Sequence, residues 1–98
     1  MAKFDVYAGP DGGYLLDCQA DVLRNLNTRF VVPLGPQAEH AGADALLNPV
    51  FVADGQRLVM LTHLAAAIPA NLLRTAMTSL EAHEYEIGRA LDMLIGGF

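Results

Sequence analysis

The chain has no tryptophan, one cysteine and one serine among its 98 residues. A single cysteine, Cys18, cannot form an intramolecular disulfide, so a small secreted fold held by disulfides is excluded. Cys18 follows Leu15, Leu16 and Asp17 in a strand-like run. We therefore interpret it as a small packed apolar residue and not as a nucleophile.

Basic residues are also scarce. Six Lys and Arg stand against eleven Asp and Glu, which gives a formal net charge of −5. Direct nucleic-acid binding depends on clustered Lys and Arg that contact phosphates. The six here are scattered along the chain, at Lys3, Arg24, Arg29, Arg57, Arg74 and Arg89. We therefore expect a protein or a small molecule as the direct partner, and not DNA or RNA.

Long apolar runs are missing as well. The longest uncharged stretch, 58–73, contains His63, Pro69 and Asn71, and it falls short of the roughly 20 apolar residues that a membrane span needs. No long apolar run follows Lys3 near the N-terminus, so we expect no secretory signal. These patterns predict a cytoplasmic protein that does not enter a membrane.

Apolar residues are nevertheless abundant, at 53% of the chain. A single domain of this length, spanning 1–98, buries only about two-thirds of the surface of its unfolded chain. Some apolar surface is therefore left over, and a twofold interface would cover it with a second copy of itself. We expect a homodimer.

Alternating apolar residues and turn residues predict a series of strands. Asp54-Gly55 between two apolar runs is the strongest hairpin signal, and the turn residues of 9–13 predict another hairpin. Pro33 is expected to lie at an edge, an end or a bulge. The segments 21–27 and 35–44 are expected to be loops, and 71–75 a short strand or helical turn. The predicted strands are 4–7, 14–20, 29–34, 47–53 and 56–62, the last continuing toward 64–68.

A C-terminal helix is the clearest predicted element. Thr78 and Glu81 have the spacing of a capping box, and Ser79 is a competing cap. After them, apolar residues recur on one face of an amphipathic helix of about four turns. Strands followed by one helix predict an α+β domain with an antiparallel sheet. The apolar positions are Leu80, Ile87, Ala90, Leu91, Leu94 and Ile95, of which Leu91, Leu94 and Ile95 are the predicted dimer contacts.

No catalytic constellation stands out. His40, His63 and His83 have no metal-ligand spacing with one another or with Cys18, and the only serine, Ser79, is already a candidate cap. The glycines of 9–13 lack the lysine of a phosphate-binding loop and the spacing of a dinucleotide site. We expect no enzymatic activity, no metal and no cofactor.

The order of several short segments resembles the CcdB-type toxins of bacterial toxin–antitoxin modules, which poison DNA gyrase. A Val-Pro-Leu strand, a Pro-Val strand, an apolar residue with Pro and one final helix ending in Gly and an apolar residue form a moderately specific series that covers nearly the whole chain. The segments are Phe4-Asp5-Val6-Tyr7, Tyr14-Leu15-Leu16-Asp17, Asp21-Val22-Leu23, Phe30-Val31-Val32-Pro33-Leu34, Leu47-Asn48-Pro49-Val50, Met60-Leu61-Thr62 and Ile68-Pro69.

The resemblance implies a homodimeric, SH3-like α+β fold, with a main antiparallel sheet, a smaller sheet and the C-terminal helix along the twofold interface. In this family a Trp-Gly-Ile-like tip enters the dimer interface of the gyrase A subunit and traps cleaved DNA. Gly96, Gly97 and Phe98 occupy these positions, with Gly96 in place of the Trp. A rigid aromatic anchor often contributes 2 kcal/mol or more, and Gly offers no side chain.

The resemblance also implies a CcdA-like antitoxin, whose disordered C-terminal segment folds on the toxin. The surface that it wraps in the family includes the strand that contains Leu58, Val59, Met60 and Leu61. The antitoxin would supply the DNA-binding domain, so the chain would take part in repressing its own operon and meet DNA only indirectly.

Three alternatives stay open. The chain could be a family member that no longer targets gyrase and acts as an antitoxin-binding protein or on another target. A MazF-type ribonuclease, with Arg57 and His63 as its only candidate catalytic residues, is less favoured because the chain is acidic. Finally, Phe98 could fold back on the core while Gly96 and Gly97 merely cap the helix.

Overall fold

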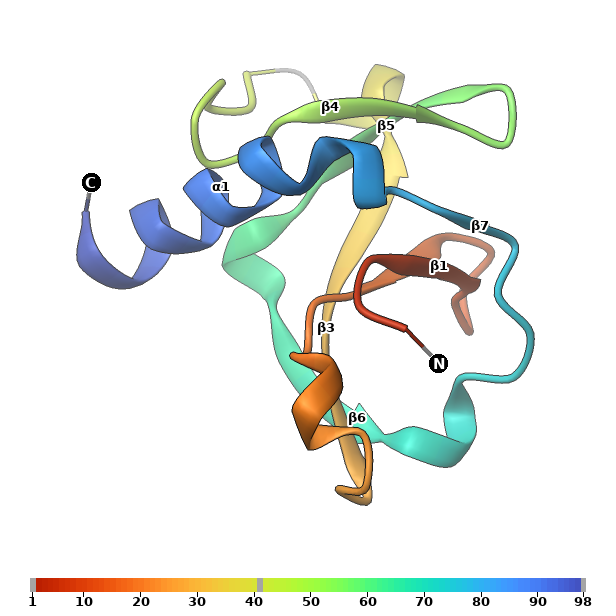
Figure 1. Ribbon diagram of the computed structural model, residues 1–98. Coiled ribbons are helices and arrows are strands. Elements are labelled where there is room, and N and C mark those ends of the chain that lie inside the picture. The colour runs from red at the N-terminus through yellow and green to blue at the C-terminus, as the bar shows by residue number, and fades with distance from the viewer. Residues whose placement is uncertain (1, 41, 98) are drawn as a thin grey trace.

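A nearly closed antiparallel sheet and one C-terminal helix make up the fold (Figure 1). The computed structural model describes residues 2–40 and 42–97. The strands are hydrogen-bonded in the order β4-β5-β3-β2-β1-β7, and β6 pairs with β3. The predicted α+β class with an SH3-like sheet is thereby confirmed, and all seven strands found in the described residues belong to a single sheet. The elements are β1 Asp5–Ala8, β2 Tyr14–Asp17, β3 Thr28–Pro36, β4 Val50–Ala53, β5 Gln56–Met60, β6 Ala66–Pro69, β7 Thr78–Ser79 and α1 Glu84–Gly96.

The long strand β3 organises the sheet. One edge of β3 pairs with β2, and the other edge is shared by β6 along its first half and β5 along its second. Pro33 lies between these halves, since β6 pairs as far as Val31 and β5 pairs from Leu34. The expectation of an edge, an end or a bulge was wrong. An interior proline is tolerated here because the break between β6 and β5 leaves no ladder bond for its missing N–H.

The hairpin of β4 and β5 turns at Asp54-Gly55, as predicted. Both residues have positive φ, 52° and 70°, which is the two-residue type I′ geometry that matches the twist of the strands. However, β4 begins at Val50 and not at residue 47. The preceding segment forms a turn instead, because the Asp44 carboxylate accepts hydrogen bonds from the backbone N–H groups of Leu46 and Leu47.

The helix begins later than the capping pattern predicted. Thr78 is a strand residue that pairs with Val6, so it does not cap the helix. The Ser79 hydroxyl accepts a hydrogen bond from the N–H of Glu81 and starts a 3₁₀ turn, after which α1 begins at Glu84. Glu84 and Glu86 in the first turn favour this start because the helix N-terminus carries a partial positive charge.

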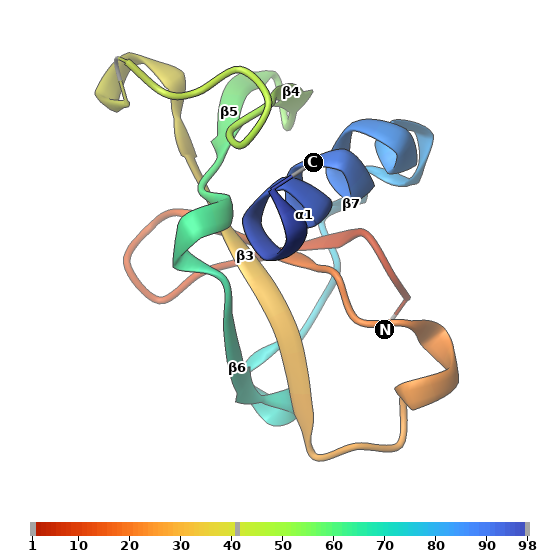
Figure 2. The same ribbon diagram turned by 90° about the vertical axis from the view of Figure 1, so that its left-hand side faces the viewer.

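The core lies between α1 and one face of the sheet. Figure 2 shows the helix nearly end-on against β3 and β5. Ile87 and Ala90 of α1 are fully buried there. The opposite face carries a smaller cluster of Tyr7, Val31 and Leu73, which the segment between β6 and β7 covers. The main core consists of Phe4, Val6, Leu16, Cys18, Val32, Leu34, Phe51, Ala53, Leu58, Met60, Leu80, Ile87 and Ala90.

Candidate functional site

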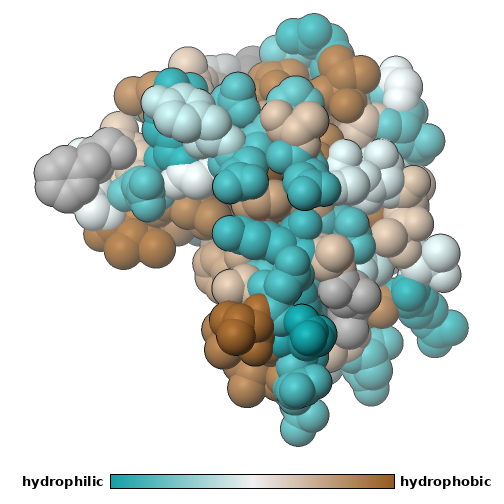
Figure 3. All heavy atoms as spheres, in the orientation of Figure 1, coloured by the Kyte–Doolittle hydropathy of each residue, from teal (hydrophilic) through white to brown (hydrophobic). Residues whose placement is uncertain are grey.

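The C-terminal end of α1 is the most exposed apolar part of the helix. Leu91 packs partly against the core, whereas Leu94 is exposed and Ile95 is 81% exposed. Figure 3 shows hydrophobic atoms gathered at this end of the helix. The predicted stripe therefore divides into an N-terminal part that fills the core and a C-terminal part, Leu94 and Ile95, that is exposed.

Gly97 ends the helix in the left-handed conformation, with φ of 77°. Its N–H donates to the carbonyl of Met93 at 3.1 Å, so the backbone direction is fixed up to this residue. Glycine adopts this conformation without the penalty that a Cβ imposes. Gly96 is the last helical residue and is exposed. Phe98 lies outside the described residues.

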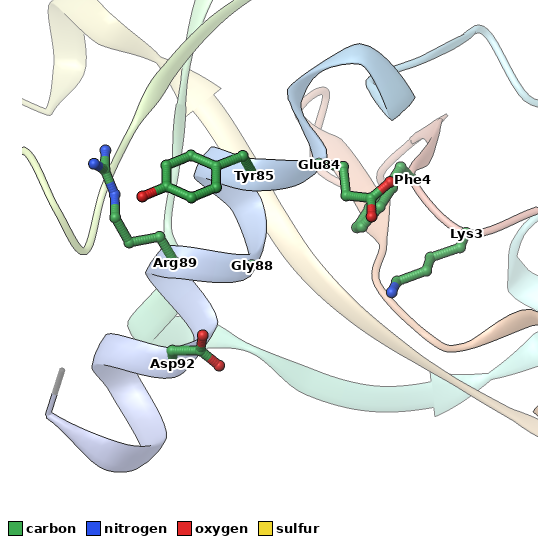
Figure 4. Close-up of a pocket in the computed structure, with 7 residues that line it drawn as sticks. All are labelled: Lys3, Phe4, Glu84, Tyr85, Gly88, Arg89 and Asp92. Carbon is green, nitrogen blue, oxygen red and sulfur yellow. The ribbon is translucent and has the colours of Figure 1, made fainter.

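A shallow hollow runs along the outward face of α1 (Figure 4). Its volume is about 360 Å³. Gly88 lines the hollow and has no side chain to fill it, and nothing lies within 4 Å of the position that a Cβ would take. Figure 4 shows Tyr85 and Arg89 side by side on the helix, and the Arg89 guanidinium lies 5.6 Å from the centre of the Tyr85 ring. The lining residues are Lys3, Phe4, Glu84, Tyr85, Gly88, Arg89 and Asp92.

Phe4 joins this hollow to the core. It is buried, with only 4% of its surface exposed, and the Lys3 ammonium lies 4.8 Å from its ring centre. Its φ is 73°, a conformation that is a true outlier for a bulky residue. Two backbone bonds hold it, because its N–H donates to Asp17 and its carbonyl accepts from Leu80. The hollow thus rests on a rigid and strained support.

The hollow contains charges of both signs, from Lys3, Glu84, Arg89 and Asp92. Burial raises the pKa of Cys18, the lone thiol, to about 12, so it stays protonated and unreactive. Within 2–40 and 42–97, no group of three His, Cys, Asp or Glu side chains is placed to hold a metal ion.

Comparison with known families decides what kind of protein this is. The sequence matches the family model described as CcdB protein over residues 3–97. The chain belongs to the CcdB family. It is therefore, at the level of the family, a toxin of a toxin–antitoxin module. No curated protein matches the sequence, and none of the helices in the described parts is long and apolar enough to cross a membrane.

In this CcdB chain the strand predicted to bind the antitoxin lies inside the sheet. Leu58, Val59 and Met60 are buried, and β5 is hydrogen-bonded to β3 on one edge and β4 on the other. Only Leu61 is partly exposed, in a small hollow beside Asn48. The antitoxin-binding role of these four residues stays a prediction. Met60→Asp would place a charge in the core, so it would report on folding and not on binding.

Arg57 and His63, the pair considered for a ribonuclease, have different surroundings. Arg57 donates from Nε to the Gln37 side chain at 2.7 Å. His63 lies past the other end of β5, with its Nδ1 3.4 Å from the Asn48 side-chain nitrogen. Arg57 and His63 therefore lie near opposite ends of β5, and each contacts a different polar side chain.

The sequence did not reveal a second exposed apolar surface, on the 3₁₀ turn Asp21–Leu23. Val22 is 84% exposed, and Leu23 and Leu26 are exposed beside it. Figure 3 shows this patch at the lower end of the molecule. Gln19 holds the turn, because its side chain accepts from Phe30 N–H and donates to the Leu23 carbonyl. The sequence did contain a signal for this surface, because three apolar residues lie within the segment 21–27 that was expected to be a polar loop.

The sequence also did not reveal a buried ion pair between β2 and β3. Asp17 and Arg29 are fully buried, and the Asp17 Oδ2 accepts from Arg29 Nε at 3.0 Å and from Nη2. The Arg29 Nη1 has no hydrogen-bond partner in the described parts of the chain. Arg29 is therefore a structural residue and not part of a basic surface.

Proposed function

We propose that this CcdB protein poisons DNA gyrase through its C-terminal end and is neutralised by a CcdA-like antitoxin, with which it represses its own operon. The exposed end of α1 supports this proposal most directly. Gly97 fixes the direction in which the chain leaves the helix, and both Gly96 and Gly97 are exposed. A rigid support with a short apolar tip is suited to insertion into a cleft of another protein.

The hollow along residues 84–92 of α1 extends the proposed contact surface. Tyr85 and Arg89 are residue types enriched at the centres of protein interfaces. Both line the hollow, and the Arg89 guanidinium lies over the Tyr85 ring. Strain at Phe4 is typical of functional sites, and Phe4 lines the same hollow.

A second candidate function is a CcdB protein that no longer acts on gyrase. This alternative rests on Gly96, because the family resemblance places a Trp at this position and the chain has no Trp. Glycine removes the aromatic anchor and adds backbone freedom that binding must restrict. Such a protein would still bind the antitoxin.

Dimer formation is part of the proposal. Leu94 and Ile95 are exposed on the helix, and we infer that the same residues of a second copy cover them around a twofold axis. We expect Ile95→Asp to convert a dimer into a monomer, because two carboxylates would face each other in an apolar contact. Light scattering at micromolar concentration measures this. Val52→Asp, at another exposed apolar position, on β4, is the control, and a monomeric parent chain would reject the interface.

Growth after induced expression tests the proposed toxicity. We expect arrest when the chain is expressed alone and normal growth when the adjacent antitoxin gene is expressed with it. Growth that continues at high levels of folded protein would contradict a toxic function. Arrest that persists in a host with toxin-resistant gyrase would assign the toxicity to another target.

A further inference from the structure

A second pocket lies on the face of the sheet that points away from α1. It is formed by the end of β1, the following turn, β6 and the segment after β6. Its volume is about 400 Å³, which is within the range of small-molecule sites. The walls are mainly apolar, and the pocket is continuous with the cluster of Tyr7, Val31 and Leu73. The lining residues are Tyr7, Ala8, Gly9, Pro10, Leu15, Ile68, Leu72, Arg74 and Thr75.

One positive charge borders this apolar space. Among the described residues that line the pocket, Arg74 is the only charged one. No carboxylate in the described parts of the chain lies within ion-pair distance of its guanidinium. In a protein with net charge −5, an unpaired arginine beside an apolar wall favours an anion attached to an apolar group.

The backbone of β1 adds a free donor on the same side. The Val6 carbonyl accepts from Met77 N–H, and the Gly9 N–H donates across the hairpin to Gly13. Because backbone groups alternate sides along a strand, Ala8 directs its N–H and carbonyl away from β2. Pairing with β7 ends at Val6, so no strand in the described parts of the chain uses these groups of Ala8.

The size of this free edge favours a small molecule over a peptide strand. Strand addition needs several successive backbone pairs, and Ala8 alone is unpaired between the β7 contact and the hairpin turn. Tyr7 also lines the pocket. Its hydroxyl makes no hydrogen bond within the described residues, and burial, with Asp5 and Asp17 nearby, raises its pKa. It therefore stays protonated at neutral pH.

We propose that this pocket binds a small organic carboxylate with an apolar body, of the size of a medium-chain fatty acid. The apolar body contacts Leu15, Ile68 and Leu72, while the carboxylate meets Arg74 at the rim and accepts from Ala8 N–H. This site lies on the opposite face of the sheet from α1, so it is independent of the proposed gyrase contact.

Titration of the full-length protein with octanoate, followed by amide NMR shifts, tests the proposal. The matched ligand is 1-octanol, which has the same apolar chain without the charge. We expect saturable shifts at Ala8, Gly9 and Thr75, with octanoate bound about five- to tenfold more tightly than octanol. Equal affinity for the two ligands, no saturable shift, or shifts centred on other residues would overturn the proposal.

Variants separate the two halves of the site. Arg74→Gln should reduce octanoate affinity to that of octanol while leaving octanol unchanged, and Arg57→Gln, another exposed arginine far from the pocket, should change neither. Leu72→Ala should weaken the binding of both ligands by a similar factor, because it removes apolar contact area from the pocket wall and leaves the charge of Arg74 in place. Leu72 and Arg74 are exposed, so both variants should fold. Octanoate affinity that is unaffected by Arg74→Gln would refute the assigned role of this residue.

Discussion

We expect Asp17→Ala to lower the free energy of unfolding by about 3–5 kcal/mol, the usual cost of leaving one partner of a buried ion pair uncompensated. Arg29 would keep its charge in a site where neither side chain is exposed to solvent. The variant would also lose the bond from Gln19 N–H to Asp17 Oδ1, which is 3.0 Å long. That bond supports the chain just before the exposed turn at Val22.

Urea unfolding measures this difference, and Asp11→Asn in an exposed turn is the control, with an expected change below about 0.5 kcal/mol. The double variant Asp17→Leu/Arg29→Met should recover much of the lost stability, because apolar residues of similar volume often replace a buried pair at little cost. A loss below 1 kcal/mol in Asp17→Ala would show that the pair is not buried in solution.

Deletion of residues 96–98 should abolish growth arrest while leaving the fold intact. Gly96 and Gly97 are exposed and follow the last buried residue of α1, Ala90. We therefore expect a melting temperature within about 4 °C of the parent, which corresponds to less than about 1 kcal/mol. Loss of several kcal/mol would instead show that the C-terminal end packs on the core.

Single substitutions refine this test of the tip. Gly97→Ala adds a Cβ at φ of 77°, and Gly12→Ala adds one at φ of 81° in a distant exposed turn, with open space around both. The backbone penalty should be similar, about 1 kcal/mol, but only Gly97→Ala should reduce toxicity. Gly96→Trp should raise activity against gyrase at least about tenfold, because it restores an aromatic anchor.

Local sequence patterns were sufficient for most of the fold. The two hairpins and the amphipathic helix follow from turn residues and from periodicity, both of which are local. Errors arose where tertiary pairing overrode a local signal. Thr78 has the spacing of a helix cap, but its backbone pairs with Val6. Pro33 is unsuited to an interior strand in general, and the switch of partners from β6 to β5 makes it acceptable here.

The candidate site was harder to predict from the sequence, because the exposure of a side chain depends on tertiary packing. The same apolar pattern places Ile87 in the core and Ile95 in solvent, and nothing in the spacing distinguishes them. Met60 lies in a run that could be core or contact, and the neighbouring strands bury it. Arg29 and Asp17 are twelve positions apart, and only the register of β2 on β3 brings their charges together.

The accumulation of cleaved DNA by purified gyrase tests the proposed function most directly. Supercoiled plasmid, gyrase and ATP are incubated with the parent chain or with the chain lacking residues 96–98, and trapped cleavage complexes are counted after the protein is digested. The proposal predicts that linear DNA accumulates with the parent chain, that it falls to background with the deletion, and that added antitoxin releases the enzyme. Normal supercoiling without trapped cleavage, at saturating concentrations of the folded parent chain, would contradict it.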